Sequence, residues 1–206
     1  MSKLASLSGF HGLARPGRFG RQDGAPGVTI AERADLGLAT VAARKGRDEA
    51  LGVRVRKVYG AALPSGPSLA QGKGVTFIGT GPGQWFALSA KFKNEALAGE
   101  LAGKLEGLAS VSDQSSGRAV LNLRGPHVRD VLAKGLAIDL DPLVFPPDGA
   151  VTSTISHIGV QLWSGDAGGY DIAVSRSMAE GFWRWLTASA AEYGYEVAEG
   201  QTRKTA

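Results

Sequence analysis

The same order of secondary-structure signals occurs twice along this chain, and this repetition limits the folds open to it more than any other feature. Apolar and turn patterns predict a strand, a helix, two hairpinned strands and a second helix, and the order returns about 80 to 85 positions later. Two such βαββα units would form antiparallel sheets with helices packed on one face, and together they would share a core. The order therefore predicts an α+β fold rather than a tandem solenoid.

The first copy contains three predicted strands and two predicted helices. The strands cover residues 36–43, 75–78 and 85–89. One helix covers residues 48–59 with Asp48 as its predicted cap, and the other begins after Asn94 as a second cap. The second helix keeps one apolar face through Leu97, Leu101, Leu105 and Leu108.

The second copy repeats this order after a short break. Its predicted strands cover residues 118–123, 154–163 and 170–174. Its first helix follows Gly125 and Pro126 and has the apolar positions Val128, Val131, Leu132 and Leu136. Its last helix covers residues 178–193, and a glycine-rich turn over 165–169 joins the last two strands.

These patterns divide the chain into four segments. We predict a flexible basic N-terminal arm over residues 1–27, a first α+β unit over 28–112, a second α+β unit over 113–198 and a C-terminal tail over 199–206.

The chain has no cysteine, which excludes disulfides, thiolate catalysis and zinc sites built on Cys. This composition fits a reducing compartment. Glycine and proline interrupt the N-terminal residues before an apolar run of secretory length can form, and no segment approaches the ~20 apolar residues of a membrane span. We therefore expect a cytoplasmic protein without a membrane partner.

The net charge of +4 comes from the first 22 residues of the N-terminal arm. Lys3, Arg15, Arg18 and Arg21 are its basic residues, and no acidic residue lies among the first 22 positions. Such an arm can contact nucleic acid, lie in a groove of a partner protein or remain a solvated end. The neutral remainder of the chain argues against nucleic acid, so we predict Arg15, Arg18 and Arg21 as candidate interface residues.

No catalytic group stands out in the sequence. The glycine-rich segment 79–83 is followed by an apolar strand rather than a helix, which favours a hairpin turn over a phosphate-binding loop. Asp139 and Asp141 fit a solvated loop better than a pair of catalytic carboxylates. The chain has three histidines, His11, His127 and His157. None of them has a second ligand at metal-binding spacing. We predict no catalytic, cofactor-binding or metal-binding residue.

The last helix carries three aromatic residues within four positions, Phe182, Trp183 and Trp185. Phe182 and Trp185 share one stripe with Leu186, whereas Trp183 points to another side. The helix can be buried on two sides within its own domain, or another subunit can complete one side, because tryptophan is favoured at the centres of interfaces. We predict these three aromatic residues as candidate interface residues.

A series of short motifs together resembles one protein family. In chain order these are Gly81-Pro82-Gly83-Gln84-Trp85, Asp113-Gln114-Ser115, Arg118-Ala119-Val120-Leu121, Leu123-Arg124-Gly125-Pro126, Arg129-Asp130-Val131-Leu132, Asp139-Leu140-Asp141-Pro142, Phe145-Pro146-Pro147 and Phe182-Trp183-Arg184-Trp185-Leu186. They resemble the gamma subunits of heterotetrameric sarcosine oxidase over roughly residues 79–193. The scaffold is also similar to the folate-binding fold of the glycine cleavage aminomethyltransferase, but this broader similarity assigns folate to no residue.

The resemblance implies a non-catalytic structural subunit of a complex that oxidatively demethylates sarcosine to glycine, giving hydrogen peroxide and 5,10-methylenetetrahydrofolate. It implies that other subunits hold FAD, FMN, NAD and tetrahydrofolate, which agrees with the lack of a dinucleotide-binding fingerprint in this sequence. The implied partners are larger flavin-bearing and folate-binding subunits and a small fourth subunit. The alternative is a stand-alone folate-dependent one-carbon enzyme or a folate-binding protein.

Overall fold

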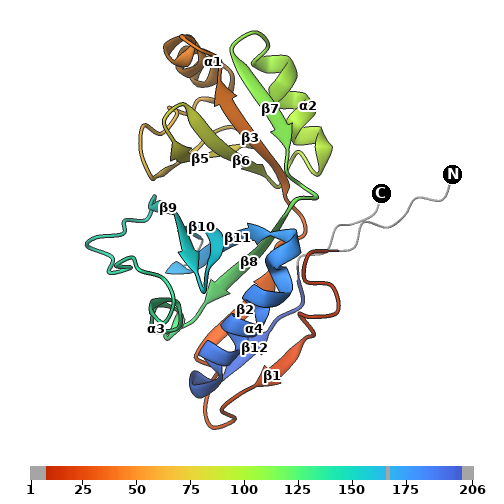
Figure 1. The fold of residues 1–206 in the computed structure, drawn as a ribbon, viewed down its shortest axis with the longest axis vertical. Helices are drawn as coiled ribbons and strands as arrows, with labels where there is room; N and C mark the ends of the chain where they lie inside the picture. Colours follow the sequence, from red (N-terminus) through yellow and green to blue (C-terminus); the bar gives the residue numbers. More distant parts are fainter. Residues whose placement is uncertain (1–7, 166–167, 201–206) are drawn as a thin grey trace, which may run out of the picture.

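The structure is a computed structural model that describes residues 8–165 and 168–200. These residues form two β-sheets, each with its own helices, and Figure 1 shows one unit above the other. Three parts of the predicted segments lie outside the described residues: positions 1–7 of the arm, Asp166 and Ala167 of the second glycine-rich turn, and positions 201–206 of the tail.

The first unit is a five-stranded antiparallel sheet with two helices. Its elements are β3 (Gly37–Ala43), α1 (Asp48–Tyr59), β4 (Leu69–Gln71), β5 (Thr76–Gly81), β6 (Gln84–Ser89), α2 (Glu95–Lys104) and β7 (Ala109–Asp113). The strand order is β4-β5-β6-β3-β7. The strands, helices and hairpin predicted for this unit are present, and the structure adds β4 and β7.

Helix α1 forms because its apolar residues fall on one face. Leu51, Val55 and Tyr59 recur every four positions and are buried, and Gly60 ends the helix in the left-handed conformation with φ 73°. The predicted cap at Asp48 is wrong, since Arg47 occupies that position without a side-chain bond and Asp48 is the first helical residue. Its carboxylate still lies where the positive end of the helix dipole favours an acid.

The second unit is a seven-stranded sheet that also uses residues from before the first unit. Its elements are β1 (Gly17–Phe19), β2 (Val28–Glu32), β8 (Arg118–Arg124), α3 (Val128–Ala133), β9 (Ala150–Ile155), β10 (Ile158–Ser164), β11 (Tyr170–Ser175), the 3-10 helix η2 (Arg176–Met178), α4 (Ala179–Ala190), the 3-10 helix η3 (Ala191–Tyr193) and β12 (Tyr195–Val197). The strand order is β1-β12-β2-β8-β11-β10-β9. Strand β12 runs parallel to β2, and the other neighbours are antiparallel.

The predicted boundaries at the N-terminal side need correction. Strand β2 pairs with β8 and β12, so it belongs to the second sheet and not to a first unit beginning at residue 28. The described part of the predicted arm is also not a free end, because β1 pairs with β12 and Phe10 is only 1% exposed. The buried side chains of Phe10, Val28 and Ile30 supply the physical reason, since each removes apolar surface from water within the second core.

One predicted strand is in fact a hairpin. The segment 154–163 turns back between β9 and β10 at Ser156 and His157, whose φ angles are 48° and 66°. Two consecutive residues with positive φ form the type I′ turn that matches the twist of hairpin strands. This turn lacks the Asn-Gly pair that usually marks it, which is why the sequence reads as one continuous strand.

Three hydrophobic clusters explain the arrangement of the layers. The helices of each unit cover one face of their own sheet, with Leu51 and Leu97 in the first core and Phe182 and Leu186 in the second. A third cluster joins the opposite faces of the two sheets, where the ring of Phe86 lies 6.4 Å from that of Trp163. The order is therefore helices, sheet, sheet, helices, which confirms the predicted α+β class and the helices on one face of each sheet.

Backbone hydrogen bonds also join the two sheets at one edge. Ser68 and Gly149 form an isolated antiparallel bridge immediately before β4 and β9. The amide of Leu69 donates to the carbonyl of Asp148 at 2.8 Å, and the amide of Ala150 donates to the carbonyl of Pro67 at 3.1 Å. The two units are thus connected by backbone pairing as well as by side-chain packing.

Candidate functional site

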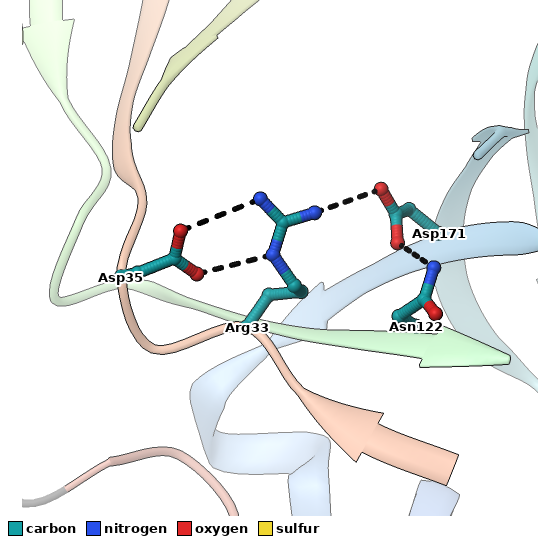
Figure 2. A network of polar contacts seen from close by, with 4 residues as sticks. All are labelled: Arg33, Asp35, Asn122 and Asp171. Carbon is teal, nitrogen blue, oxygen red and sulfur yellow. Dashed lines mark hydrogen bonds and ion pairs between the residues drawn. The ribbon is translucent and has the colours of Figure 1, made fainter. Parts of the chain in front are cut away.

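A cluster of charged and polar side chains lies where the two units meet (Figure 2). The guanidinium of Arg33 contacts Asp35 through Nε at 3.0 Å and through Nη2 at 3.4 Å. Its Nη1 donates to Oδ2 of Asp171 at 3.4 Å, and the amide of Asn122 donates to Oδ1 of the same carboxylate at 2.6 Å. Arg33 thus links two carboxylates from separate segments of the chain.

The sheet register explains why these side chains come together. Asn122 on β8 lies directly opposite Asp171 on β11, and Arg33 immediately follows β2, the other neighbour of β8. Asp171 and Asn122 are each 5% exposed. An ionised carboxylate at such burial needs charged or hydrogen-bonding partners, and the guanidinium and the amide provide them. The cluster therefore stabilises a buried charge at the junction of the units.

A cavity of about 410 Å³ lies beside this cluster, between the two sheets. Its lining contains residues from both units, among them Gln71, Ser89, Lys91, Trp163 and Asp171. Charged groups of both signs thus line the same space, whereas Trp163 is 3% exposed and packs on Phe86. Among residues 8–165 and 168–200, no group of three or more His, Cys, Asp or Glu side chains could hold a metal ion.

The predicted aromatic interface residues all have partners within their own chain. Phe182 is fully buried in the second core, and its ring lies 5.7 Å from that of Trp185. Trp185 covers Gly135, where an added Cβ would meet the indole at 2.7 Å. Trp183 packs on Phe10 with 5.9 Å between ring centroids. Both tryptophans remain partly exposed, so their role in an interface stays a prediction.

The three predicted interface arginines are exposed on the second unit. Arg15 donates from Nε to the carbonyl of Gly12 at 3.2 Å, and Arg18 donates from Nη2 to the carbonyl of Gly24 at 2.5 Å. The backbone amide of Arg21 donates to the carbonyl of Ala191 at 2.8 Å. Their interface role also stays a prediction, and the structure brings none of them into the polar cluster.

The sequence reasoning missed Arg33, Asn122 and Asp171. Asn122 stands within the apolar middle of β8, and Asp171 stands within the apolar run of β11. A polar residue in the middle of a buried strand needs a partner, so these two positions carried a usable signal. Arg33 lies in a turn rich in charges, where its sequence context has no such signal.

Comparison with known proteins places this fold. A model of the sarcosine oxidase, gamma subunit family matches residues 44–192. The sarcosine oxidase subunit gamma of Corynebacterium sp. strain U-96 is 31% identical over 172 residues, which are 81% of this chain and 80% of the relative. The corresponding subunit of strain P-1 is 31% identical over 143 residues, covering 68% of this chain and 70% of the relative. The chain belongs to the sarcosine oxidase gamma subunit family.

Solved structures agree with this family assignment. A chain of the heterotetrameric sarcosine oxidase from Corynebacterium sp. U-96 superposes with a TM-score of 0.70 and 27% identity, covering 87% of this chain and 88% of that one. Aminomethyltransferase T of the glycine cleavage system from Bartonella henselae superposes with a TM-score of 0.56 and 17% identity, covering 81% of this chain and 49% of that one. The second likeness shows the fold alone. In the described part of this gamma-family chain, no helix has the length and apolar character to cross a membrane.

Proposed function

We propose that this chain is a structural, non-catalytic subunit of a heterotetrameric sarcosine oxidase. The observation that carries the proposal is the superposition on a chain of such an oxidase over nearly the full length of both chains. The shared fold over 87% of this chain supports the same place in such an assembly. The polar cluster supports this role, since Arg33 holds two carboxylates from different segments together.

The proposed complex oxidatively demethylates sarcosine to glycine and reduces oxygen to hydrogen peroxide. The one-carbon unit passes to tetrahydrofolate as 5,10-methylenetetrahydrofolate. Larger flavin-bearing and folate-binding subunits and a small fourth subunit would hold FAD, FMN, NAD and tetrahydrofolate. We place the complex in the cytoplasm, which fractionation of the host cells would test.

A native pull-down from the chain's own host tests the proposal. We expect the tagged chain to recover larger chains with a flavin absorption spectrum, which sarcosine bleaches when oxygen is removed. A complex assembled without this chain should be less stable or less active. Recovery of the chain alone and without colour would contradict subunit membership, and unchanged stability and activity without the chain would contradict the bracing role.

Folate binding by the chain alone is the second candidate function. The observation in its favour is the cavity of about 410 Å³, whose lining includes Trp163, Lys91 and Asp171. The ammonium of Lys91 suits a ligand with a carboxylate tail, and polar groups such as Gln71 suit hydrogen bonds to a polar ring. Titration of the purified chain with tetrahydrofolate in a calorimeter tests this function, and the absence of saturable heat would exclude it.

A further inference from the structure

The loop between α3 and β9 presents two apolar side chains to solvent. Leu143 is 96% exposed and Val144 is 62% exposed, and we call these two residues the Leu143–Val144 tip. Figure 1 shows the loop, in green to teal, projecting at the left of the second unit between α3 and β9. A single exposed leucine is common on protein surfaces. The argument therefore depends on how this loop is held.

Local hydrogen bonds fix the backbone around the Leu143–Val144 tip. Oδ1 of Asp139 accepts from the amide of Asp141 at 2.9 Å, and Oδ1 of Asp141 accepts from the amide of Leu143 at 2.9 Å. The carbonyl of Asp141 accepts from the amides of Val144 and Phe145 at 2.8 and 2.7 Å. Because the loop is already ordered, burying its tip in a partner would cost little further backbone entropy.

The base of the loop is anchored on the second sheet. The ring of Phe145 packs against Tyr170 with 6.0 Å between centroids. The hydroxyl of Tyr170 donates to the carbonyl of Leu140 at 3.3 Å, and the hydroxyl of Ser164 donates to the carbonyl of Pro146 at 2.9 Å. Both ends of the loop are thus attached to strands, while the residues between them point away from the body.

The corresponding loop of the first unit is arranged differently. It connects α1 to β4 over residues 60–68, and its apolar residue Leu63 packs against the first core. The indole of Trp85 donates to the carbonyl of Pro64 at 2.8 Å and holds that loop inward. The repeated architecture can therefore pack a leucine against the core at this connection, so the fold itself does not require the full exposure of Leu143.

The surroundings of the tip are acidic. Residues 137–149 contain Asp139, Asp141 and Asp148 and no lysine or arginine, and all three aspartates are exposed. An apolar point surrounded by negative charge complements an apolar recess with a positive rim, because opposite potentials favour encounter and orientation.

We propose that the Leu143–Val144 tip is a hydrophobic anchor that inserts into an apolar recess, rimmed by lysine or arginine, on another chain of the oxidase complex. The proposal rests on the proposed function, which supplies that other chain. Leu143 fills the recess, Val144 contacts its wall, and the three aspartates face the basic rim. Interface residues of this kind carry a large share of the binding energy when they become fully buried.

The test compares two matched substitutions in the tagged chain, expressed in its host in place of the native copy. Leu143→Asp places a charge at the tip, and Val53→Asp places the same charge at another apolar position, 65% exposed on α1. We expect Leu143→Asp to lower the yield of co-purified larger chains about tenfold or more, since loss of a buried anchor weakens binding by at least that factor. Val53→Asp should leave the yield at the wild-type value.

Two further measurements separate binding from folding. Both purified variants should melt at the wild-type temperature, because their side chains contact little of their own chain. Leu143→Ala, which adds no charge, should reduce the yield in the same direction by a smaller factor.

Each result of the pull-down has one meaning. Equal yields for Leu143→Asp and wild type overturn the anchor while the proposed function stands. If the wild-type chain recovers no other chain, the proposed function is contradicted. The anchor then has no partner, and the proposal of an anchor fails as well. Self-association of the isolated chain that Leu143→Asp abolishes would identify a second copy as the occupant and also overturn the proposal.

Discussion

The two units share an order of elements but differ in how their sheets are completed. In the first unit β7 pairs directly with β3, whereas in the second unit β2 lies between β8 and the corresponding strand β12. The second sheet thus takes a strand from before the first unit, and the whole first unit is inserted between β2 and β8. A repeated pattern of elements therefore does not define domains that are contiguous in sequence.

The structural repeat contains more strands than the βαββα order predicted from the sequence. Each unit runs strand, helix, three strands, helix, strand, from β3 to β7 and from β8 to β12. The short strands β4, β7 and β12 were not predicted, because each contains only two apolar residues and so displays no apolar run. Their pairing partners, rather than their own sequences, determine them.

The largest expected effect tests whether β2 belongs to the second core. Ile30→Ala should lower the free energy of unfolding by about 2–5 kcal/mol, because Ile30 is fully buried and the change leaves a cavity. Thr29→Ala on the same strand is the matched control and should cost less than about 1 kcal/mol. Urea unfolding followed by circular dichroism measures both free energies. Equal costs would mean that β2 contributes little to the stability of the second core.

The second prediction concerns the polar cluster of Arg33, Asn122 and Asp171. The first unit has no residue in this group of three. Arg33→Leu should cost about 1–3 kcal/mol, because it leaves the buried carboxylate of Asp171 with weaker compensation. In the double variant with Asp171→Leu, the two costs should be non-additive by about 1 kcal/mol or more. Arg184→Ala breaks an exposed pair with Glu180 and serves as the control, with an expected cost of about 0.5 kcal/mol. Additive costs for Arg33 and Asp171 would refute the coupling.

The third prediction tests the first core by its response to alkaline pH. Burial, with a contribution from nearby Glu100, raises the pKa of Tyr59 in the first core to about 12. Because the unfolded tyrosine ionises near pH 10 and the folded one does not, the stability linked to Tyr59 is present below pH 10 and is lost as the pH rises toward 12. Wild type should therefore lose about 2 kcal/mol more than Tyr59→Phe between these pH values. Parallel stability profiles for the two proteins would contradict the shifted pKa.

The smallest expected effect compares two turns at corresponding places. The β4–β5 connection of the first unit uses Gly74 at φ 76°, whereas the β9–β10 turn of the second unit holds Ser156 and His157 at positive φ. Ser156→Asn combined with His157→Gly should raise the free energy of unfolding by about 1 kcal/mol, because these residues adopt the turn with less strain. Gly74→Ala should change stability in the opposite direction. A destabilised double variant in urea unfolding would contradict this turn type.

Much of the fold follows from the sequence through local rules. The predicted helix over residues 48–59 is present as α1, although its first residue is the predicted cap Asp48 and the N-cap is Arg47. The leucines of α2 and the apolar strands β3, β6, β8 and β11 were recognised through such local rules. These elements depend on neighbours within a few positions, which a sequence displays directly.

The candidate sites also contain features that local sequence predicts and features that it does not. Exposure of the N-terminal arginines and the aromatic content of α4 could be predicted from the sequence. The intramolecular partners of the aromatic residues could not, since Phe10 and Gly135 lie far from α4 along the chain. Phe10 stands in a segment that has the composition of a free arm.

Local patterns in the sequence were sufficient for the class of the fold, for most helices and strands and for the family, which the comparisons confirm. Three features became visible only in the folded chain: β2 enters the second sheet, Arg33 contacts Asp171 and Leu143 is exposed to solvent. The physical reason is that these features depend on pairings between distant segments, whose free energy comes from burial and compensated charge rather than from local propensity.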